Sequence, residues 1–102
     1  MAKKIDGVIE AVRYTRDQQI SLVRAYVRRG PAFSDRVLLD RDTLLNKIKE
    51  GKTFYTGQRK ELWAGTFDLG KIVHSADRDG KEFLTTRPDA PGRDQLEETP
   101  VF

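Results

Sequence analysis

Basic and aromatic side chains, which suit contact with an anionic partner, gather in two parts of the chain. The candidate contact residues are Arg24, Arg28, Arg29, Arg36, Tyr55, Arg59 and Lys60. Proteins that bind single-stranded nucleic acid combine a cationic groove with aromatic side chains on which the bases stack. The first group, the four arginines at positions 24 to 36, and the second group, residues 55, 59 and 60, therefore predict a surface that contacts nucleic acid, or another partner, through cations and aromatic rings.

The second group lies in the segment FYTGQRKELWAG, whose aromatic residues also suit a hydrophobic core. Gly57 favours a type II′ turn, so the segment predicts a hairpin that reverses at this residue. In that register Phe54 and Trp63 share one face with Phe67, and Tyr55 lies on the other. We favour core positions for Phe54 and Trp63, because buried aromatic rings dominate small cores. Tyr55 then remains at the surface.

Residue types that carry catalysis or hold metals are few and poorly spaced. The chain has no cysteine, which excludes disulfides, thiolate metal sites and cysteine nucleophiles. His74 is the only histidine, and its neighbour Ser75 points to the other face of a strand. The DRDG run at 77–80 lacks the spacing of a calcium loop and predicts a tight turn. We therefore expect a protein that is not an enzyme and that holds neither metal nor cofactor.

The charge of the chain is unevenly distributed. The net charge of the 102 residues is +3, with two Arg against four acidic residues in 87–102, so residues 1–86 carry +5. A mildly basic body is compatible with an anionic partner such as nucleic acid. Charged residues interrupt the N-terminal apolar residues, and no apolar run approaches the roughly 20 residues of a membrane span. We expect a cytoplasmic protein that does not associate with membranes.

Two runs rich in Val and Ile, residues 8–14 and 20–27, flank the polar TRDQQ and predict a β-hairpin. The predicted cross-strand pairs are Tyr14 with Ile20, Val12 with Leu22, Glu10 with Arg24, and Val8 with Tyr26. Both faces of this hairpin are apolar, whereas a hairpin with one buried face alternates more cleanly. The hairpin is therefore covered on both sides, curled into a small barrel, or exposed at an interface.

The segment DRDTLLNKIKEGK predicts a short helix. Asp40 or Asp42 suits its N-cap, and Gly51 suits a left-handed residue after its last turn. Leu44, Leu45 and Ile48 form an apolar stripe at helical spacing. Since a helix of about three turns is not stable alone, the stripe is expected to pack on the sheet.

The predicted order is three strands, this helix, two further strands and a last hairpin over residues 71–86. This order resembles an OB-type Greek-key barrel, in which a helix separates the third and fourth strands. We expect an α+β fold that is mainly β, with a small antiparallel sheet or a partly open barrel. Residues 1–86 then form a single β-rich domain, and the proline-containing residues 87–102 form a flexible, mildly acidic tail.

Two functions agree with these features. One is a small binding module that contacts nucleic acid through a basic, aromatic sheet surface. The alternative is a protein-interaction or assembly module that uses the second apolar face of the first hairpin, as a monomer or a homodimer. Salt separates the two, because phosphate contacts weaken steeply with salt and apolar contacts do not.

Overall fold

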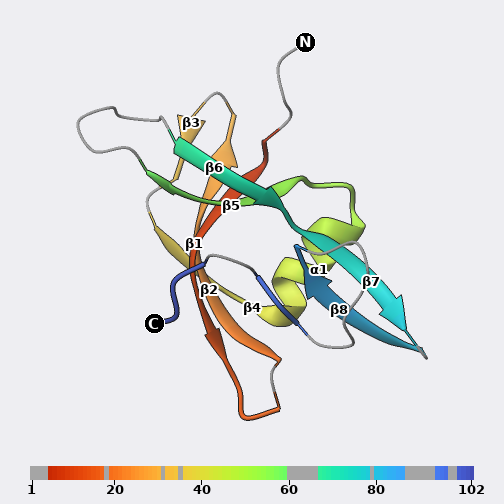
Figure 1. The fold of residues 1–102 in the computed structure, drawn as a ribbon. Coiled ribbons are helices and arrows are strands. Elements are labelled where there is room, and N and C mark those ends of the chain that lie inside the picture. The colour runs from red at the N-terminus through yellow and green to blue at the C-terminus, as the bar shows by residue number, and fades with distance from the viewer. Residues whose placement is uncertain are drawn as a thin grey trace.

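The computed structural model describes residues 5–17, 19–30, 32–34, 36–59, 67–78, 80–86, 94–96 and 99–102, with only the backbone at Ala32, Arg59 and Arg78. Figure 1 shows the elements, most of them strands. They are β1 (Gly7–Tyr14), β2 (Ile20–Arg29), β3 (Ala32–Phe33), β4 (Val37–Asp40), α1 (Arg41–Lys49), β5 (Phe54–Arg59), β6 (Phe67–Ile72), β7 (His74–Arg78) and β8 (Lys81–Thr85). This architecture confirms an α+β fold that is mainly β and has one short helix.

The main sheet has the strand order β3-β2-β1-β5-β6, and β4 also pairs with β2. Strand β5 runs parallel to β1, so the sheet is mixed, whereas the sequence predicted a small antiparallel sheet. Strand β4 also runs in the direction of β1, so α1 joins two parallel strands, as helical crossovers do. Among the described residues, β3 and β6 do not pair with each other. The sheet therefore stays open, and the OB-like element order does not produce a closed barrel.

The β1–β2 hairpin confirms the two outer predicted pairs, Tyr14 with Ile20 and Val8 with Tyr26. Its middle differs, because irregularities after Ile9 and after Arg13 shift the register by one residue. The observed inner pairs are Ala11 with Arg24, Val12 with Val23, and Arg13 with Leu22. A bulge of this kind changes the direction in which a side chain points while the strands stay paired.

The core lies between the sheet and α1. Leu44 and Leu45 are buried, and Ile48 packs against them, which confirms the predicted stripe. Asp40 is the N-cap and accepts from the backbone N–H of Thr43 at 2.8 Å. The buried cluster comprises Ile9, Val12, Ile20, Val23, Ala25, Leu44, Leu45, Phe54, Val73, Leu84 and Leu96. Helix α1 thus covers one of the two apolar faces of the β1–β2 hairpin.

The β7–β8 hairpin forms a small separate sheet beside α1. It turns between Arg78 and Lys81, and Gly80 adopts a φ of 78°, which glycine accepts at no steric cost. The turn predicted at DRDG is confirmed.

Gly57 lies inside β5 rather than in a turn, so the predicted hairpin register around it is wrong. It pairs with Leu69 of β6, and a Cβ at this position would meet the Asp68 carbonyl oxygen at 2.5 Å. Glycine is therefore required for close approach of two strands, not for a positive φ. Phe54 is buried as expected, whereas Phe67 packs elsewhere, on the opposite face of the sheet. Trp63 lies outside the described residues.

The described residues of the C-terminal segment pack against the body, in contrast to the flexible tail expected there. Gln95 bridges to Thr85 of β8, and Leu96 is 4% exposed within the core. Val101 bridges to Val12 on the part of β1 that β5 does not cover. The division of the chain at residue 86 stays a prediction, since residues 87–93 lie outside the described part.

Candidate functional site

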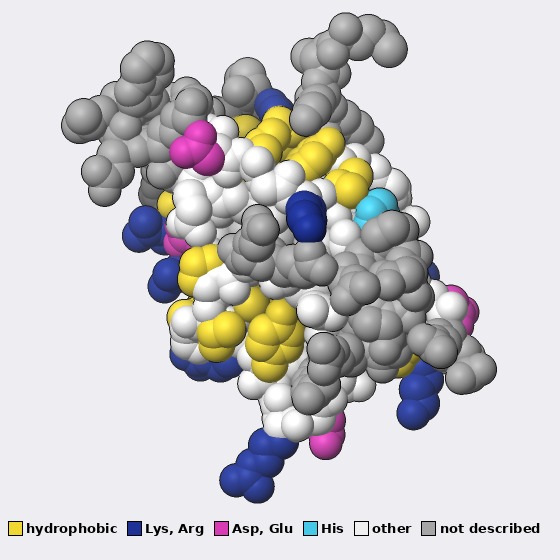
Figure 2. Space-filling view, viewed as in Figure 1, with side chains coloured by type: hydrophobic (Ala, Val, Ile, Leu, Met, Phe, Trp, Pro, Cys, Tyr) yellow, Lys and Arg dark blue, Asp and Glu magenta, His cyan; other side chains and the backbone are white. Residues whose placement is uncertain are grey.

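The sheet face opposite α1 carries a set of arginine and aromatic side chains. We call it the arginine–aromatic face and define it as Arg13, Arg24, Arg28, Arg36, Tyr26, Phe33, Phe67 and Phe102. Residues 24, 26 and 28 share this face because alternate residues of a strand point the same way. Figure 2 shows Lys and Arg side chains along the left margin of the molecule, next to hydrophobic ones near the C-terminus.

Three aromatic rings pack against one another on this face. The centroid of the Phe67 ring lies 4.9 Å from that of Phe33, edge to face, and 5.1 Å from that of Tyr26, in a tilted arrangement. Tyr26 is only 1% exposed and pairs with the equally buried Val8 across the hairpin. These rings form a second small core, which explains why both faces of the first hairpin are apolar in sequence.

The carboxylate of Glu10 lies beneath the arginines and is 5% exposed. Its Oε1 atom lies 2.8 Å from Nε of Arg24 and 2.7 Å from Nε of Arg36. Its Oε2 atom accepts from the hydroxyl of Tyr26 at 3.2 Å. A buried carboxylate is costly unless charged and polar partners surround it, and Glu10 has three. Glu10 thus positions two guanidinium groups at one point of the surface.

The two guanidiniums remain accessible. The side chain of Arg36 is 63% exposed and that of Arg24 is 41% exposed. Nε of Arg36 also donates to the hydroxyl of Tyr26 at 2.9 Å. This hydrogen bond, and then the charge of Glu10, raise the pKa of Arg36, so the group stays cationic. Within the described part of the chain, no terminal Nη nitrogen of either arginine has a hydrogen-bond partner. Each fork therefore has donors left for a ligand.

Arginines of the face, Arg24 among them, also lie over aromatic rings. The guanidinium carbons of Arg13 and Arg24 lie 4.7 and 5.0 Å from the ring centroid of Phe102. That of Arg28 lies 4.7 Å from the ring centroid of Phe33. At less than about 6 Å, the electron-rich face of the ring attracts the guanidinium electrostatically.

The structure brings together three of the seven predicted contact residues, Arg24, Arg28 and Arg36. Arg29 is exposed at the end of β2, without a side-chain contact to this group in the described residues. Tyr55 is half-buried and lies in one row with Val8 and Tyr26 across the sheet. The backbone of Arg59 pairs with Phe67, but its side chain, like all of Lys60, lies outside the described part.

Sequence reasoning missed the aromatic partners and the central position of the carboxylate. Glu10 was expected to pair with Arg24 alone, because Arg36 lies in a separate segment. The i, i+2 spacing of Arg24, Tyr26 and Arg28 was the available signal for the face. Phe102 had no such signal, since it reaches the face from the far end of the chain.

The described residues contain no group of three or more His, Asp or Glu side chains arranged to hold a metal ion. His74 is half-buried in β7 opposite Thr85, whereas Ser75 is exposed and points the other way. None of the helices in this part of the chain is long and apolar enough to cross a membrane.

The chain was also compared with family models, curated proteins and solved structures, and no match was found. The function is therefore inferred from the arginine–aromatic face.

Proposed function

We propose that the arginine–aromatic face binds nucleic acid through the phosphate backbone, without a sequence preference. The observation that carries this proposal is the buried Glu10, which orients Arg24 and Arg36 through their Nε atoms. A guanidinium fork matches phosphate oxygens geometrically and forms strong charge-assisted hydrogen bonds with them. Two forks at one point are a suitable receptor for one phosphate group.

The charge of this cluster favours an anion. One carboxylate neutralises only one of the two guanidiniums that contact it, so a positive charge remains at the surface. Arg13 and Arg28 add further cations on the same face. Phosphate contacts of this kind supply sequence-independent affinity by releasing counterions from the nucleic acid.

The contact mode differs from the open stacking platforms expected from the sequence. Tyr26 is buried, and the rings of Phe33 and Phe67 pack on each other. The accessible planar groups are instead the guanidiniums, which stack on unpaired bases in many RNA complexes. We therefore place phosphate contact first and base stacking on arginine second.

The alternative, a homodimer through the second apolar face of the first hairpin, has less support. Val8, Ala11 and Tyr26 on the hairpin are at most 1% exposed within a single copy of the chain. A second copy is not needed to cover them. A molar-mass measurement in solution by light scattering would reveal a dimer directly.

The test is a titration of a short fluorescent single strand at two salt concentrations. The test variant combines Glu10→Gln, Arg24→Gln and Arg36→Gln, so that no buried charge is left without its partners. The matched control is Lys81→Gln, which removes one exposed cation away from the face and lowers the net charge by one, as the triple variant does. Circular dichroism confirms that each variant is folded.

Wild type is expected to bind at low salt and to lose affinity steeply as salt rises. The triple variant should bind more weakly than the control, with a salt slope smaller by about 0.7 for each phosphate of the single strand that it no longer neutralises. Absence of binding by wild type at low salt contradicts the proposal and favours a protein partner. If the triple variant and the control lose affinity equally, the loss is explained by net charge alone, which contradicts the proposed role of the face.

A further inference from the structure

A pocket of about 320 Å³ opens at the other end of the sheet, where β1 begins and β2 ends. Its lining residues are Asp6, Val27, Arg28, Gly30, Lys47, Lys52 and Phe54. Ligand pockets in proteins span roughly 300–1,000 Å³, so this one suits a small molecule. It does not include Glu10, Arg24 or Arg36, the centre of the arginine–aromatic face.

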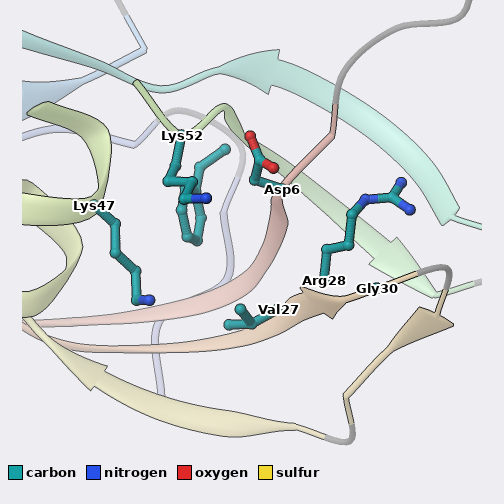
Figure 3. Close-up of a pocket in the computed structure, with 7 residues that line it drawn as sticks. Asp6, Val27, Arg28, Gly30, Lys47 and Lys52 are labelled. Carbon is teal, nitrogen blue, oxygen red and sulfur yellow. The ribbon is translucent and has the colours of Figure 1, made fainter. Parts of the chain in front are cut away.

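Two lysines line the pocket from the end of α1, where the turn of the chain brings their backbones together. Gly51 adopts a φ of 95° and turns the chain back after the last helical residue. The backbone N–H of Lys52 then donates to the carbonyl of Lys47 at 3.0 Å. Figure 3 shows both side chains coming from the helix side of the pocket. Neither ammonium group has a hydrogen bond or ion pair with a described residue.

The remaining walls combine one carboxylate, one further cation and an apolar surface. Asp6 accepts from the backbone N–H of Thr53 through Oδ2 at 2.8 Å, so part of its hydrogen-bonding capacity is used within the protein. Nε of Arg28 donates to the Ile5 carbonyl oxygen at 2.5 Å, on the side opposite the lysines in Figure 3. Val27 and Phe54 supply the apolar walls.

We infer that this pocket binds a small molecule that carries a phosphate group on a compact apolar body. The lining contains three cationic residues and one carboxylate, so it favours an anion, and two lysines that reach the pocket from one side suit the double charge of a phosphate monoester. Val27, together with the nearly fully buried Phe54, supplies the apolar part of the lining, which suits a compact apolar body. The site is distinct from the surface proposed for nucleic acid, although Arg28 borders both.

Phenyl phosphate is the probe, titrated at constant ionic strength and followed by the amide signals of uniformly ¹⁵N-labelled protein. The amides of Gly30 and Lys52 should shift in a saturable manner, whereas that of Glu82, which lies outside the pocket, should not. Inorganic phosphate, which lacks the apolar body, and phenol, which lacks the anion, should both bind more weakly. A wild-type protein without saturable shifts, or with shifts spread over the whole surface, overturns the inference.

Lys47→Gln and Lys52→Gln should each weaken phenyl phosphate binding by about tenfold or more, the usual effect of losing one charge-assisted hydrogen bond. Lys81→Gln, which removes one exposed cation outside the pocket, should leave it unchanged. If all three variants bind phenyl phosphate equally weakly, the inference is overturned, because the lower net charge then explains the loss of affinity. Both pocket variants should retain the oligonucleotide affinity of the Lys81→Gln control, so a failure here is distinguishable from a failure of the nucleic-acid proposal.

Discussion

Arg41, the first residue of α1, forms a two-pronged ion pair with the fully buried carboxylate of Asp94. Nε of Arg41 donates to Oδ2 of Asp94 at 2.7 Å, and Nη2 donates to Oδ1 at 3.3 Å. The same carboxylate accepts the backbone N–H groups of Ile20 and Leu84 at 2.7 and 2.9 Å. The hydrogen bond to Asp94, and then the charge of that carboxylate, raise the pKa of Arg41. One side chain from the C-terminal segment thus joins α1, β2 and β8.

Asp94→Ala is expected to lower the free energy of unfolding by about 3–5 kcal/mol, the usual effect of removing one partner of a buried ion pair. The loss arises because a half-buried guanidinium and two backbone N–H groups lose their acceptor. Asp94→Asn should cost less, since its amide oxygen still accepts. Urea unfolding measures both.

Truncation after Thr86 should lower the free energy of unfolding more than either Asp94 variant, because Leu96 also leaves the core. An unchanged thermal midpoint after truncation would support a flexible tail instead.

The helix stripe gives a second stability test with an internal control. Leu44 is fully buried, so Leu44→Ala should cost about 2–5 kcal/mol through reduced burial and a cavity. Leu38 on β4 is 59% exposed, so Leu38→Ala should stay within about 0.5 kcal/mol of wild type. Both values come from the same chemical unfolding experiment. Equal effects at the two positions would contradict the placement of α1 on the sheet.

The helix cap predicts a dependence on pH. Hydrogen bonds from the side chain and backbone of Thr43 hold the pKa of Asp40 below its ordinary value. A carboxylate of this kind stabilises the folded state above its unfolded pKa, and its contribution is lost as the pH falls through the folded pKa. Asp40→Ala should therefore lower the thermal midpoint at neutral pH, and the difference from wild type should shrink in strong acid. A difference independent of pH would assign the effect to helix propensity.

Local signals in the sequence predicted the elements whose contacts are local. The N-cap at Asp40, the left-handed Gly51 and the turn at Gly80 each follow from a residue type in its own segment. The ends of the β1–β2 hairpin follow from the pairing of apolar residues. The register inside this hairpin was not predictable, because the bulge places Glu10 where Arg36, from another segment, also reaches it.

Long-range contacts account for the features that sequence reasoning missed. The parallel pairing of β1 with β5 depends on a crossover through α1, and no sequence motif predicts this crossover. The C-terminal residues 94–102 are mostly polar and include one proline, a composition that is typical of tails. Their docking includes one buried carboxylate, Asp94, one buried apolar residue, Leu96, and the pairing of Val101 with Val12, and these partners lie far away in the chain.

Gly57 provides a direct test of the corrected strand register. Its added Cβ would meet the backbone carbonyl oxygen of Asp68 at 2.5 Å, and Cγ1 of Val8 at 3.2 Å. Gly57→Ala should therefore destabilise the fold by about 1–3 kcal/mol, the range for overpacked sites. Gly30→Ala is the comparison. No atom lies within 4 Å of a Cβ added at Gly30, so only its φ of 62° disfavours a side chain there. Thermal unfolding compares the two. A Gly57→Ala variant as stable as wild type would favour the hairpin turn at this residue.

Glu10→Gln separates the orientation of the arginines from their charge. The substitution raises the net charge by one, so charge alone predicts tighter binding of a single strand at low salt. It also removes the anion that holds Nε of Arg24 and Arg36. If the oriented forks bind phosphate, Glu10→Gln should weaken binding despite the added positive charge. Asp77→Asn, on the exposed side of β7, gains the same charge away from the face and should bind slightly more tightly. The two titrations are run at one salt concentration, on proteins whose circular dichroism spectra match wild type. Tighter binding by both variants would show that the face acts only through its charge.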